Sequence, residues 1–308
     1  MGHWIKFRRG YPQHVCMKGV NGFVLFYSIS DMLVFLTHYY VIAKQYGITV
    51  DCLCFMPNHV HEFSRCVSEK VLEGFHKTVC SVYAKLFNKE HGRKGQLFKK
   101  SYLSAAKFKN KSIKNAMLYV LDNPVDGKIT TKAINYRWNF LAYKESDHPF
   151  SDKIDLRKAS RKMRRAVKEI RVSHSEMRPL GYSFLHRIFK NLDTKEKKQL
   201  IDLIVSLYNP VDYSSLSNYY GDFSNALEMV DINSGSEHDI NDERDDFSQY
   251  IKMSNAAYRA GYMPGYFKSM EREDIMRLMT VLASRTSATS VQIYKFLHIE
   301  CHGKDSSS

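Results

Sequence analysis

Two histidines separated by a single valine, His59 and His61, lie in the segment DCLCFMPNHVHEF at residues 51–63. In a β-strand, side chains two positions apart share one face of the sheet, so this spacing would set two imidazoles side by side. A His-x-His pair is also common as the ordinary polar face of a half-buried strand. The pair therefore indicates chemistry only if other functional residues accompany it.

Tyr119 is the candidate that could accompany the histidines. It lies in the segment KSIKNAMLYVLDNP at residues 111–124, whose apolar stripe at helical spacing consists of Ile113, Met117, Val120 and Leu121. Tyr119 falls nearly opposite this stripe, together with Asn115 and Asn123, so it is not expected in the core. Pro124 should end the helix and push Asn123 toward a non-helical conformation. Taken alone, Tyr119 would be an ordinary surface tyrosine.

The surrounding chain alternates strand and helix patterns, which would position these residues. Helices are indicated by apolar residues at helical spacing and by a glycine at the end, such as Gly47. The strands are expected at 14–20, 48–63 and 95–108, and the helices at 28–47, 67–92 and 111–124. The first half of the chain therefore predicts one mixed α and β unit.

From about residue 149 the composition changes to helix formers and charged residues, without clear strands. Residues 157–171 hold eight basic residues against one acidic residue, Glu169. The basic residues are Arg157, Lys158, Arg161, Lys162, Arg164, Arg165, Lys168 and Arg171. Such a run is usually a solvated helix face, but in a chain this basic it also predicts a stripe that faces phosphates.

Near the end of the chain, residues 275–299 predict two short apolar helices around the polar break SRTSA. This is the outline of a helix-turn-helix, although two helices of a small bundle give the same pattern. The residues expected to pack inward are Ile293, Phe296 and Leu297. Those expected to face outward, toward DNA if the motif binds it, are Thr289, Gln292 and Lys295.

The formal net charge of +14 favours a polyanionic partner. Nucleic acid is the commonest such partner, and an anionic membrane surface is the competitor. Against the membrane, no run of eighteen apolar residues occurs, and the first residues lack the apolar segment of a signal peptide. We therefore expect a soluble, intracellular protein. The six cysteines show no CxxC pair or zinc-site spacing, so we expect reduced thiols and no structural zinc.

Two separated motifs, in the same order, resemble a known family. The segment FMPNHVHEF resembles the MPNHVH segment of the HUH single-tyrosine transposases. The segment GQLFKKSYLSAAKF and the later YVLDNPVDGKI resemble their REP-associated branch, in which the tyrosine opens a Tyr-x-x-x-Asn-Pro motif. The resemblance covers about residues 11–143 and includes YRWNFLAY after the Asn-Pro.

This resemblance implies a ferredoxin-like α+β domain whose sheet carries the histidine pair and whose helix presents the tyrosine. Carried over by motif, His59 and His61 would be metal ligands and Tyr119 the nucleophile. Asn123 would be a third metal ligand or an amide that orients the site. The metal would be divalent, Mg²⁺ or Mn²⁺, supplemented by water and phosphate oxygens. Attack by the tyrosine would leave a 5′-phosphotyrosine linkage and a free 3′-hydroxyl.

We therefore predict an enzyme, a DNA transposase that cleaves and rejoins single-stranded or hairpin DNA. The domains expected are a transposase domain at 1–148, a basic helical region at 149–230, an acidic linker at 231–246, a helix-turn-helix-like region at 247–301 and a disordered tail at 302–308. The resemblance implies a bacterial, cytoplasmic, nucleoid-associated protein. It favours a monomer over a homodimer.

Two alternatives stay open at this point. A replication or mobilisation relaxase would use the same three residues on an origin. A non-catalytic regulator would bind DNA through the helix-turn-helix and keep the first domain as a relic. The chain also departs from the family at Glu62 and Ser64, where aliphatic residues are usual. Glu62 would point away from the histidines, so either a basic residue meets it or that face is less covered.

Overall fold

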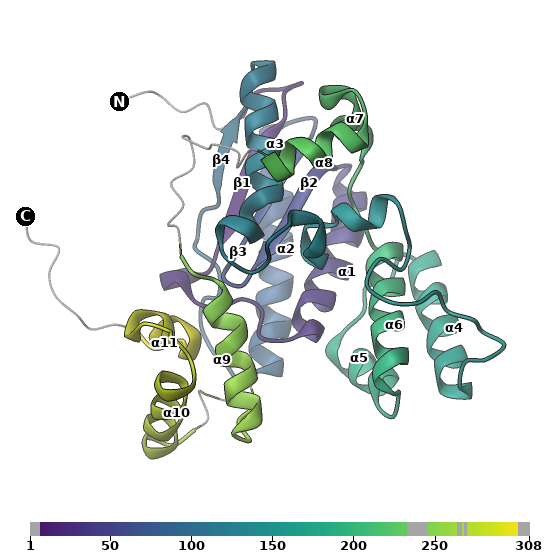
Figure 1. Cartoon of the computed structure of the whole chain (residues 1–308). Coiled ribbons are helices and arrows are strands. Elements are labelled where there is room, and N and C mark those ends of the chain that lie inside the picture. The colour runs from purple at the N-terminus through teal and green to yellow at the C-terminus, as the bar shows by residue number, and fades with distance from the viewer. Residues whose placement is uncertain (1–6, 233–244, 264–266, 268–269, 301–308) are drawn as a thin grey trace, which may run out of the picture.

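The computed structural model describes residues 7–232, 245–263, 267 and 270–300 (Figure 1). Four antiparallel strands form one sheet in the order β2-β3-β1-β4. They are β1 (Gln13–Lys18), β2 (Thr49–Met56), β3 (His59–Arg65) and β4 (Leu103–Ala106). The three helices that accompany the sheet are α1 (Ile29–Tyr46), α2 (Glu69–Glu90) and α3 (Asn110–Asp126). We call β1 to α3 the strand unit. Its mixed composition confirms the expected α+β class.

The remaining helices confirm that the chain after residue 149 is helical in its described part. They are α4 (Arg161–Ser175), α5 (Tyr182–Phe189), α6 (Thr194–Leu207), α7 (Ser214–Tyr220), α8 (Phe223–Ile232), α9 (Ser248–Arg259), α10 (Arg272–Arg285) and α11 (Ser290–Leu297). Short 3₁₀ turns lie at Val20–Gly22, Ala133–Asn135, Arg137–Asn139 and Leu141–Lys144. We call α9, α10 and α11 the terminal bundle, because these three helices contact one another.

The expected strand at 48–63 is wrong in one respect, because it is two strands joined by a tight turn. β2 ends at Met56 and β3 begins at His59, so only Pro57 and Asn58 form the connection. Proline lacks an N–H for the ladder and asparagine tolerates turn conformations, which explains the break. The histidines therefore lie on a different strand from Cys52 and Cys54. The expected strand at 95–108 is also shorter, with regular pairing limited to β4.

The two faces of the sheet are covered by different helices (Figure 1). α1 and α2 pack against each other on one face, while α3 contacts β2 and β3 on the other. α1 begins with a capping box between Ser28 and Asp31 and ends at Gly47, whose φ of 64° suits glycine. These local signals explain why the sequence predicts the bounds of α1 closely.

The expectation that Pro124 ends α3 is wrong, because the helix continues to Asp126 and includes both Asn123 and Pro124. Proline in a helix removes one hydrogen bond and is most disruptive in the interior. Here it lies in the last turn, and its carbonyl accepts from the N–H of Ile129 at 2.9 Å while the Asn123 carbonyl accepts from Gly127 at 2.8 Å. These bonds close the end of the helix around the proline.

The main hydrophobic core of the described residues runs across the boundary expected at residue 148. Its buried members extend from Val15 of β1 to Leu297 of α11. α5 and α6 pack against α1, and α8 packs against α3. Most of the linker predicted at 231–246, and all of the tail predicted at 302–308, lie outside the described residues.

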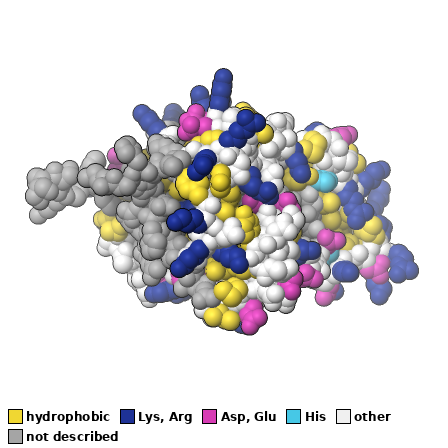
Figure 2. All heavy atoms as spheres, turned by 90° about the horizontal axis from the view of Figure 1, so that it is seen from above, with side chains coloured by type: hydrophobic (Ala, Val, Ile, Leu, Met, Phe, Trp, Pro, Cys, Tyr) yellow, Lys and Arg dark blue, Asp and Glu magenta, His cyan; other side chains and the backbone are white. Residues whose placement is uncertain are grey.

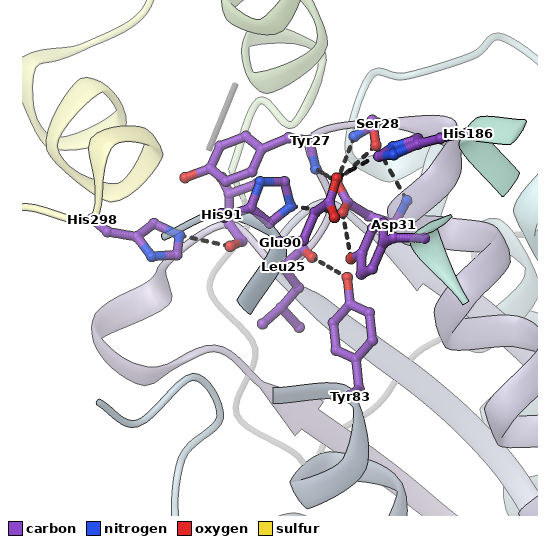
Figure 3. Close-up of polar contacts among 11 residues, drawn as sticks. Leu25, Tyr27, Ser28, Asp31, Tyr83, Glu90, His91, His186 and His298 are labelled. Carbon is purple, nitrogen blue, oxygen red and sulfur yellow. Dashed lines mark hydrogen bonds and ion pairs between the residues drawn. The ribbon is translucent and has the colours of Figure 1, made fainter. Parts of the chain in front are cut away.

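A buried polar cluster around Asp31 joins α1, α2 and α5 (Figure 3). The Asp31 carboxylate accepts from the backbone N–H groups of Tyr27 at 2.9 Å and Ser28 at 2.8 Å. The Tyr182 hydroxyl donates to it at 2.6 Å, and His91 Nε2 lies 2.8 Å away. Since Asp31 is fully buried, these partners replace the water that a carboxylate would otherwise need.

Candidate functional site

The histidine pair lies on a central strand, on the sheet face that α3 covers. In the register of β1 and β3, His61 faces Cys16 and His59 faces Lys18. The two imidazoles stand beside each other, with ring centroids 4.7 Å apart and planes nearly perpendicular. The strand period therefore does bring both side chains to one face, as the spacing predicts. Both are buried.

Tyr119 reaches this pair from α3. Its ring centroid lies 5.4 Å from that of His61. The side chain is half-buried instead of lying on an open polar face, and its helix neighbour Asn123 is only 7% exposed. The physical reason is tertiary: α8 packs against α3, and Phe247 lies against Gly127 at the end of the helix. The histidine motif and the tyrosine motif thus meet, although 58 residues separate His61 from Tyr119.

His14 completes the cluster, and the sequence reasoning missed it. This residue of β1 is fully buried, and its Nε2 lies 3.1 Å from Nδ1 of His61. Its ring centroid lies 5.7 Å from that of Tyr119. The signal that could have found it is the alternation in QHVCMK, which places His14, Cys16 and Lys18 on one face of a strand. That alternation does not say which strand would lie beside β1.

Asn58 fixes the orientation of His59. The Asn58 amide nitrogen donates to the carbonyl of Gly22 at 3.2 Å, which sets which end of the amide carries oxygen. The Asn58 Oδ1 then lies 2.7 Å from Nδ1 of His59 and must accept, so Nδ1 carries the proton. In both His59 and His61, Nδ1 makes the contact to a neighbouring side chain. Nε2 is therefore the nitrogen that each ring could offer to a metal.

The residues at this site fit a divalent metal as two imidazole ligands plus oxygen donors from outside the chain. Within the described part of the chain, no group of three or more His, Cys, Asp or Glu side chains could hold a metal ion. Asn123, predicted as a third ligand or orienting amide, donates its side-chain N–H to the carbonyl of Tyr119 at 2.7 Å. That bond leaves the carboxamide oxygen for another role. Mg²⁺ and Mn²⁺ commonly take water and phosphate oxygens, so two protein nitrogens suit a substrate-completed site.

Glu62 points to the opposite face of the sheet, as expected. Of the two possibilities, a basic partner or a less covered face, the structure shows the basic partner. His76 Nε2 of α2 lies 3.0 Å from the carboxylate, and the Ser64 hydroxyl also donates to it. Burial alone would raise the pKa of Glu62, but the charge and hydrogen bond of His76, with the hydrogen bond from Ser64, lower the pKa below its ordinary value. This pair stabilises the far face of the sheet and lies outside the candidate site.

The basic run at 157–171 forms the exposed side of α4 and of the turn before it. The residues of α4 that are buried, Met163, Ala166, Val167 and Ile170, lie on its other side. In Figure 1, α4 lies at the right edge of the molecule and α11 at the lower left. Figure 2 shows Lys and Arg side chains crowded at the same right-hand end. The two surfaces predicted to contact DNA are therefore separate.

The outward direction predicted for Gln292 on α11 is wrong. Gln292 is buried, and its side chain donates to Asp245 at 2.7 Å and accepts from the N–H of Thr289 at 2.8 Å. Thr289 is exposed but serves as the N-cap of the helix. Lys295 is half-exposed and lines a cavity beside His59. The segment does form two helices, α10 and α11, joined by four residues.

Neither a scan against protein-family models nor a search of curated proteins found a match. Among solved structures, the chain is similar to a REP-associated tyrosine transposase bound to a REP hairpin. The identity is 11%, the match covers 45% of this chain and 81% of that chain, and the TM-score is 0.37. None of the helices in the described part combines the length and apolar character needed to cross a membrane.

Proposed function

We propose that this protein is a metal-dependent DNA strand transferase, a single-tyrosine transposase of the HUH type. The observation that carries the proposal is the meeting of His59, His61 and Tyr119 on one sheet face, from two motifs far apart in sequence. Neither motif alone would select this function. The order β1-α1-β2-β3-α2-β4 supports a ferredoxin-like domain as the scaffold.

Tyr119 is the nucleophile in this proposal. Its phenolic oxygen attacks the phosphorus of a phosphodiester in line with the departing oxygen. A bond forms between Tyr119 and the 5′ phosphate, and the bond from phosphorus to the 3′ oxygen breaks. The phenol loses its proton, and the 3′ oxygen gains one to become a hydroxyl. Attack by a 3′-hydroxyl on the phosphotyrosine reverses these changes and joins the strands. Because each step exchanges one phosphodiester for another, no nucleotide cofactor is required.

His59 and His61 would hold the divalent metal, Mg²⁺ or Mn²⁺, through Nε2. A metal there would polarise the scissile phosphate as a Lewis acid and orient it toward Tyr119. The contacts of Nδ1 with Asn58 and His14 keep both rings in the orientation that ligation needs. The Asn123 side chain, bonded to the Tyr119 carbonyl, ties the tyrosine to the end of α3.

Single-stranded or hairpin DNA is the proposed substrate. A buried histidine pair beside a half-buried tyrosine leaves little room for a stacked and paired base, so an unpaired strand suits the site better. The net charge of +14 supports binding to a polyanion. We propose that the protein acts as a monomer, since His59, His61 and Tyr119 meet within one chain.

The test is the covalent intermediate. Wild-type protein is mixed with labelled single-stranded hairpins from its own genomic neighbourhood, with and without Mn²⁺, and run on a denaturing gel. We expect a slow-migrating protein–DNA species that Tyr119→Phe abolishes, because only the hydroxyl is removed. Tyr258→Phe is the matched control, since this side chain is 68% exposed and far along the chain. His59→Ala and an excess of chelator should also strongly reduce the species.

Two outcomes would contradict the proposal. If Tyr119→Phe still forms the species, another residue is the nucleophile. If the wild type never forms it with any hairpin or metal, while binding persists, a non-catalytic DNA-binding regulator explains the protein better.

A further inference from the structure

A cavity of about 410 Å³ opens beside His59, where the strand unit meets the terminal bundle. The strand unit and the loop before β4 contribute Lys18 and Lys99 to its wall. The terminal bundle and the residues leading into it contribute Lys295, Phe247 and Asp245. Lys18 and Lys99 also line a larger cavity, of about 580 Å³, that lies between α2 and the residues leading into β4.

The terminal bundle is held firmly at this wall. The backbone N–H of Val24 donates to the Lys295 carbonyl at 3.4 Å, and His298 Nε2 lies 2.7 Å from the Val24 carbonyl. The stem of Lys295 passes so close to Gly22 that an added Cβ there would lie 3.0 Å from it. On the other side, the ring of Phe247 lies 5.3 Å from the ring of His59. The cavity is thus shaped by elements more than two hundred residues apart.

Asp245 is a carboxylate set in an otherwise basic cavity. Gln292 Nε2 donates to one carboxylate oxygen at 2.7 Å, and the Tyr250 hydroxyl donates to the other at 3.2 Å. Gln292 and Tyr250 are themselves buried, so the carboxylate is held in one direction. The lysines suit a phosphate group, and the fixed carboxylate suits a hydrogen-bond donor. The cavity therefore suits a ligand that carries both groups.

We propose that this cavity binds one nucleotide of the single-stranded substrate, next to the scissile phosphate, and reads its base. The inference rests on the function proposed above and names a part of the substrate. The ammonium groups of Lys18, Lys99 and Lys295 attract the phosphate oxygens, while Phe247 forms an apolar wall. Asp245 accepts a hydrogen bond from an exocyclic amino group, the contact by which carboxylates read cytosine. The volume falls within the range of about 300–1,000 Å³ typical of small-ligand pockets.

The proposal predicts that a base with an exocyclic amino donor binds more tightly than thymine, the DNA base without one, and cytosine and adenine are used to test it. Full-length Tyr119→Phe protein is titrated with fluorescein-labelled octamers of dC, dA and dT, and binding is followed by anisotropy. We expect dC and dA to bind at least about fivefold more tightly than dT. Asp245→Asn should remove most of that preference, because the carboxamide can also donate to the thymine carbonyls. Asp246→Asn is the matched control, with the same charge change one residue away.

A second pair of variants tests the phosphate contact without touching the buried polar groups. Lys99 lines the cavity and its neighbour Lys100 does not, although both are exposed. Lys99→Gln should weaken all three octamers equally and reduce the log–log salt slope by about 0.7, whereas Lys100→Gln should leave both unchanged. Circular dichroism and thermal melting verify the fold of each variant.

Either of two results overturns the nucleotide site. One is an Asp245→Asn variant, folded by circular dichroism, that keeps the base preference of its parent. The other is a Lys99→Gln variant that behaves as Lys100→Gln does. Because these measurements use a variant without the proposed nucleophile, they are independent of cleavage. A wild type that makes no covalent species but shows the base preference would overturn the transferase and keep the site. A wild type that forms the covalent species but shows no base preference would keep the transferase and overturn the nucleotide site.

Discussion

At the scale of single residues, the two histidines of the candidate site are oriented by contacts with neighbouring side chains. His59 and His61 are both buried, and each ring is contacted at Nδ1, by Asn58 at 2.7 Å and by His14 at 3.1 Å. Partners of this kind set the tautomer and the direction of a metal-binding histidine, and their loss commonly weakens metal affinity about 10–100-fold. His14 is therefore a positioning residue in the proposed mechanism, because it acts through His61.

This role predicts the effect of replacing His14. His14→Ala should weaken Mn²⁺ binding about 10-fold or more, measured by calorimetry on the protein without DNA. His14→Gln keeps a side chain able to hydrogen-bond to Nδ1 of His61 and should recover part of the affinity. His186→Ala is the control, because the His186 side chain is 57% exposed and lies against Glu90 at the surface. If His14→Ala folds normally and binds Mn²⁺ as tightly as the wild type, His14 only packs in the core and does not position His61.

At the scale of elements, buried polar contacts connect helices that the sequence patterns treat as separate. The Asp31 cluster joins α1, α2 and α5, and Asp245 joins α9 to α11 through Gln292 (Figure 3 shows the first of these). Burial by itself would raise the pKa of Asp31, but the charge and hydrogen bond of His91, with bonds from Tyr182 and Ser28, lower the pKa below its ordinary value. The ionised carboxylate is therefore favoured by the folded state.

This lowered pKa predicts how stability depends on pH. A carboxyl group whose pKa is lower in the folded state adds to the free energy of unfolding. This stabilisation is complete at pH values above the unfolded pKa of about 4, and it is lost as the pH falls through the pKa of the folded state. Asp31→Asn should lower the free energy of unfolding at pH 7 by about 3 kcal/mol, since His91 and Tyr182 would lose a buried charged partner. It should also make the loss of stability between about pH 5 and pH 2 smaller.

Urea unfolding of Asp31→Asn at several pH values measures both effects. Asp274→Asn is the control, because the Asp274 side chain is 46% exposed. Glu62 has a lowered pKa too, so some acid-induced loss should remain in the variant. A variant whose acid dependence matches that of the wild type would show that Asp31 contributes little to it.

At the scale of the whole molecule, two of the basic regions are candidates for contact with DNA. One is the exposed side of α4, and the other is the lysine-lined cavity beside His59. In Figure 1, α4 lies at the right of the molecule and α11, whose Lys295 lines the cavity, lies at the lower left. A short single strand that occupies the cavity would not reach α4, whereas a longer hairpin could contact both.

This separation predicts a length-dependent salt effect. Replacing Arg161, Lys162 and Lys168 of α4 with glutamine should weaken binding of a long hairpin and make its log–log salt slope shallower. The expected change is about 0.7 for each single-strand phosphate that the protein no longer neutralises. Binding of an octamer should not change. The control is Lys70, Lys85 and Lys89 of α2 replaced by glutamine, which removes the same charge from another exposed surface.

The same titrations compare hairpin with blunt duplex at several salt concentrations, and the hairpin should bind more tightly. Equal affinity for both DNAs at every salt concentration would favour a regulator of double-stranded DNA over the transferase. An octamer whose affinity falls as much as that of the hairpin in the α4 variant would contradict the separation of the two surfaces.

The sequence by itself determined what depends on neighbours along the chain. The period of a strand sets His59 and His61 on one face, the capping residues Ser28 and Gly47 define α1, and helical spacing leaves the basic residues of α4 exposed. These properties follow from backbone geometry and local hydrogen bonds. They need no knowledge of what packs nearby.

Only the tertiary structure decided which distant residues meet. His14 reaches His61 because β1 lies beside β3, and the covering of α3 by later elements buries Asn123. Gln292 turns inward because Asp245, 47 residues earlier, offers its carboxylate as a partner. Strand order, helix docking and buried hydrogen bonds are set by the packing of the whole core, whose free energy is shared among residues far apart in sequence. For that reason the histidine motif could be recognised in the sequence, but its surroundings could not.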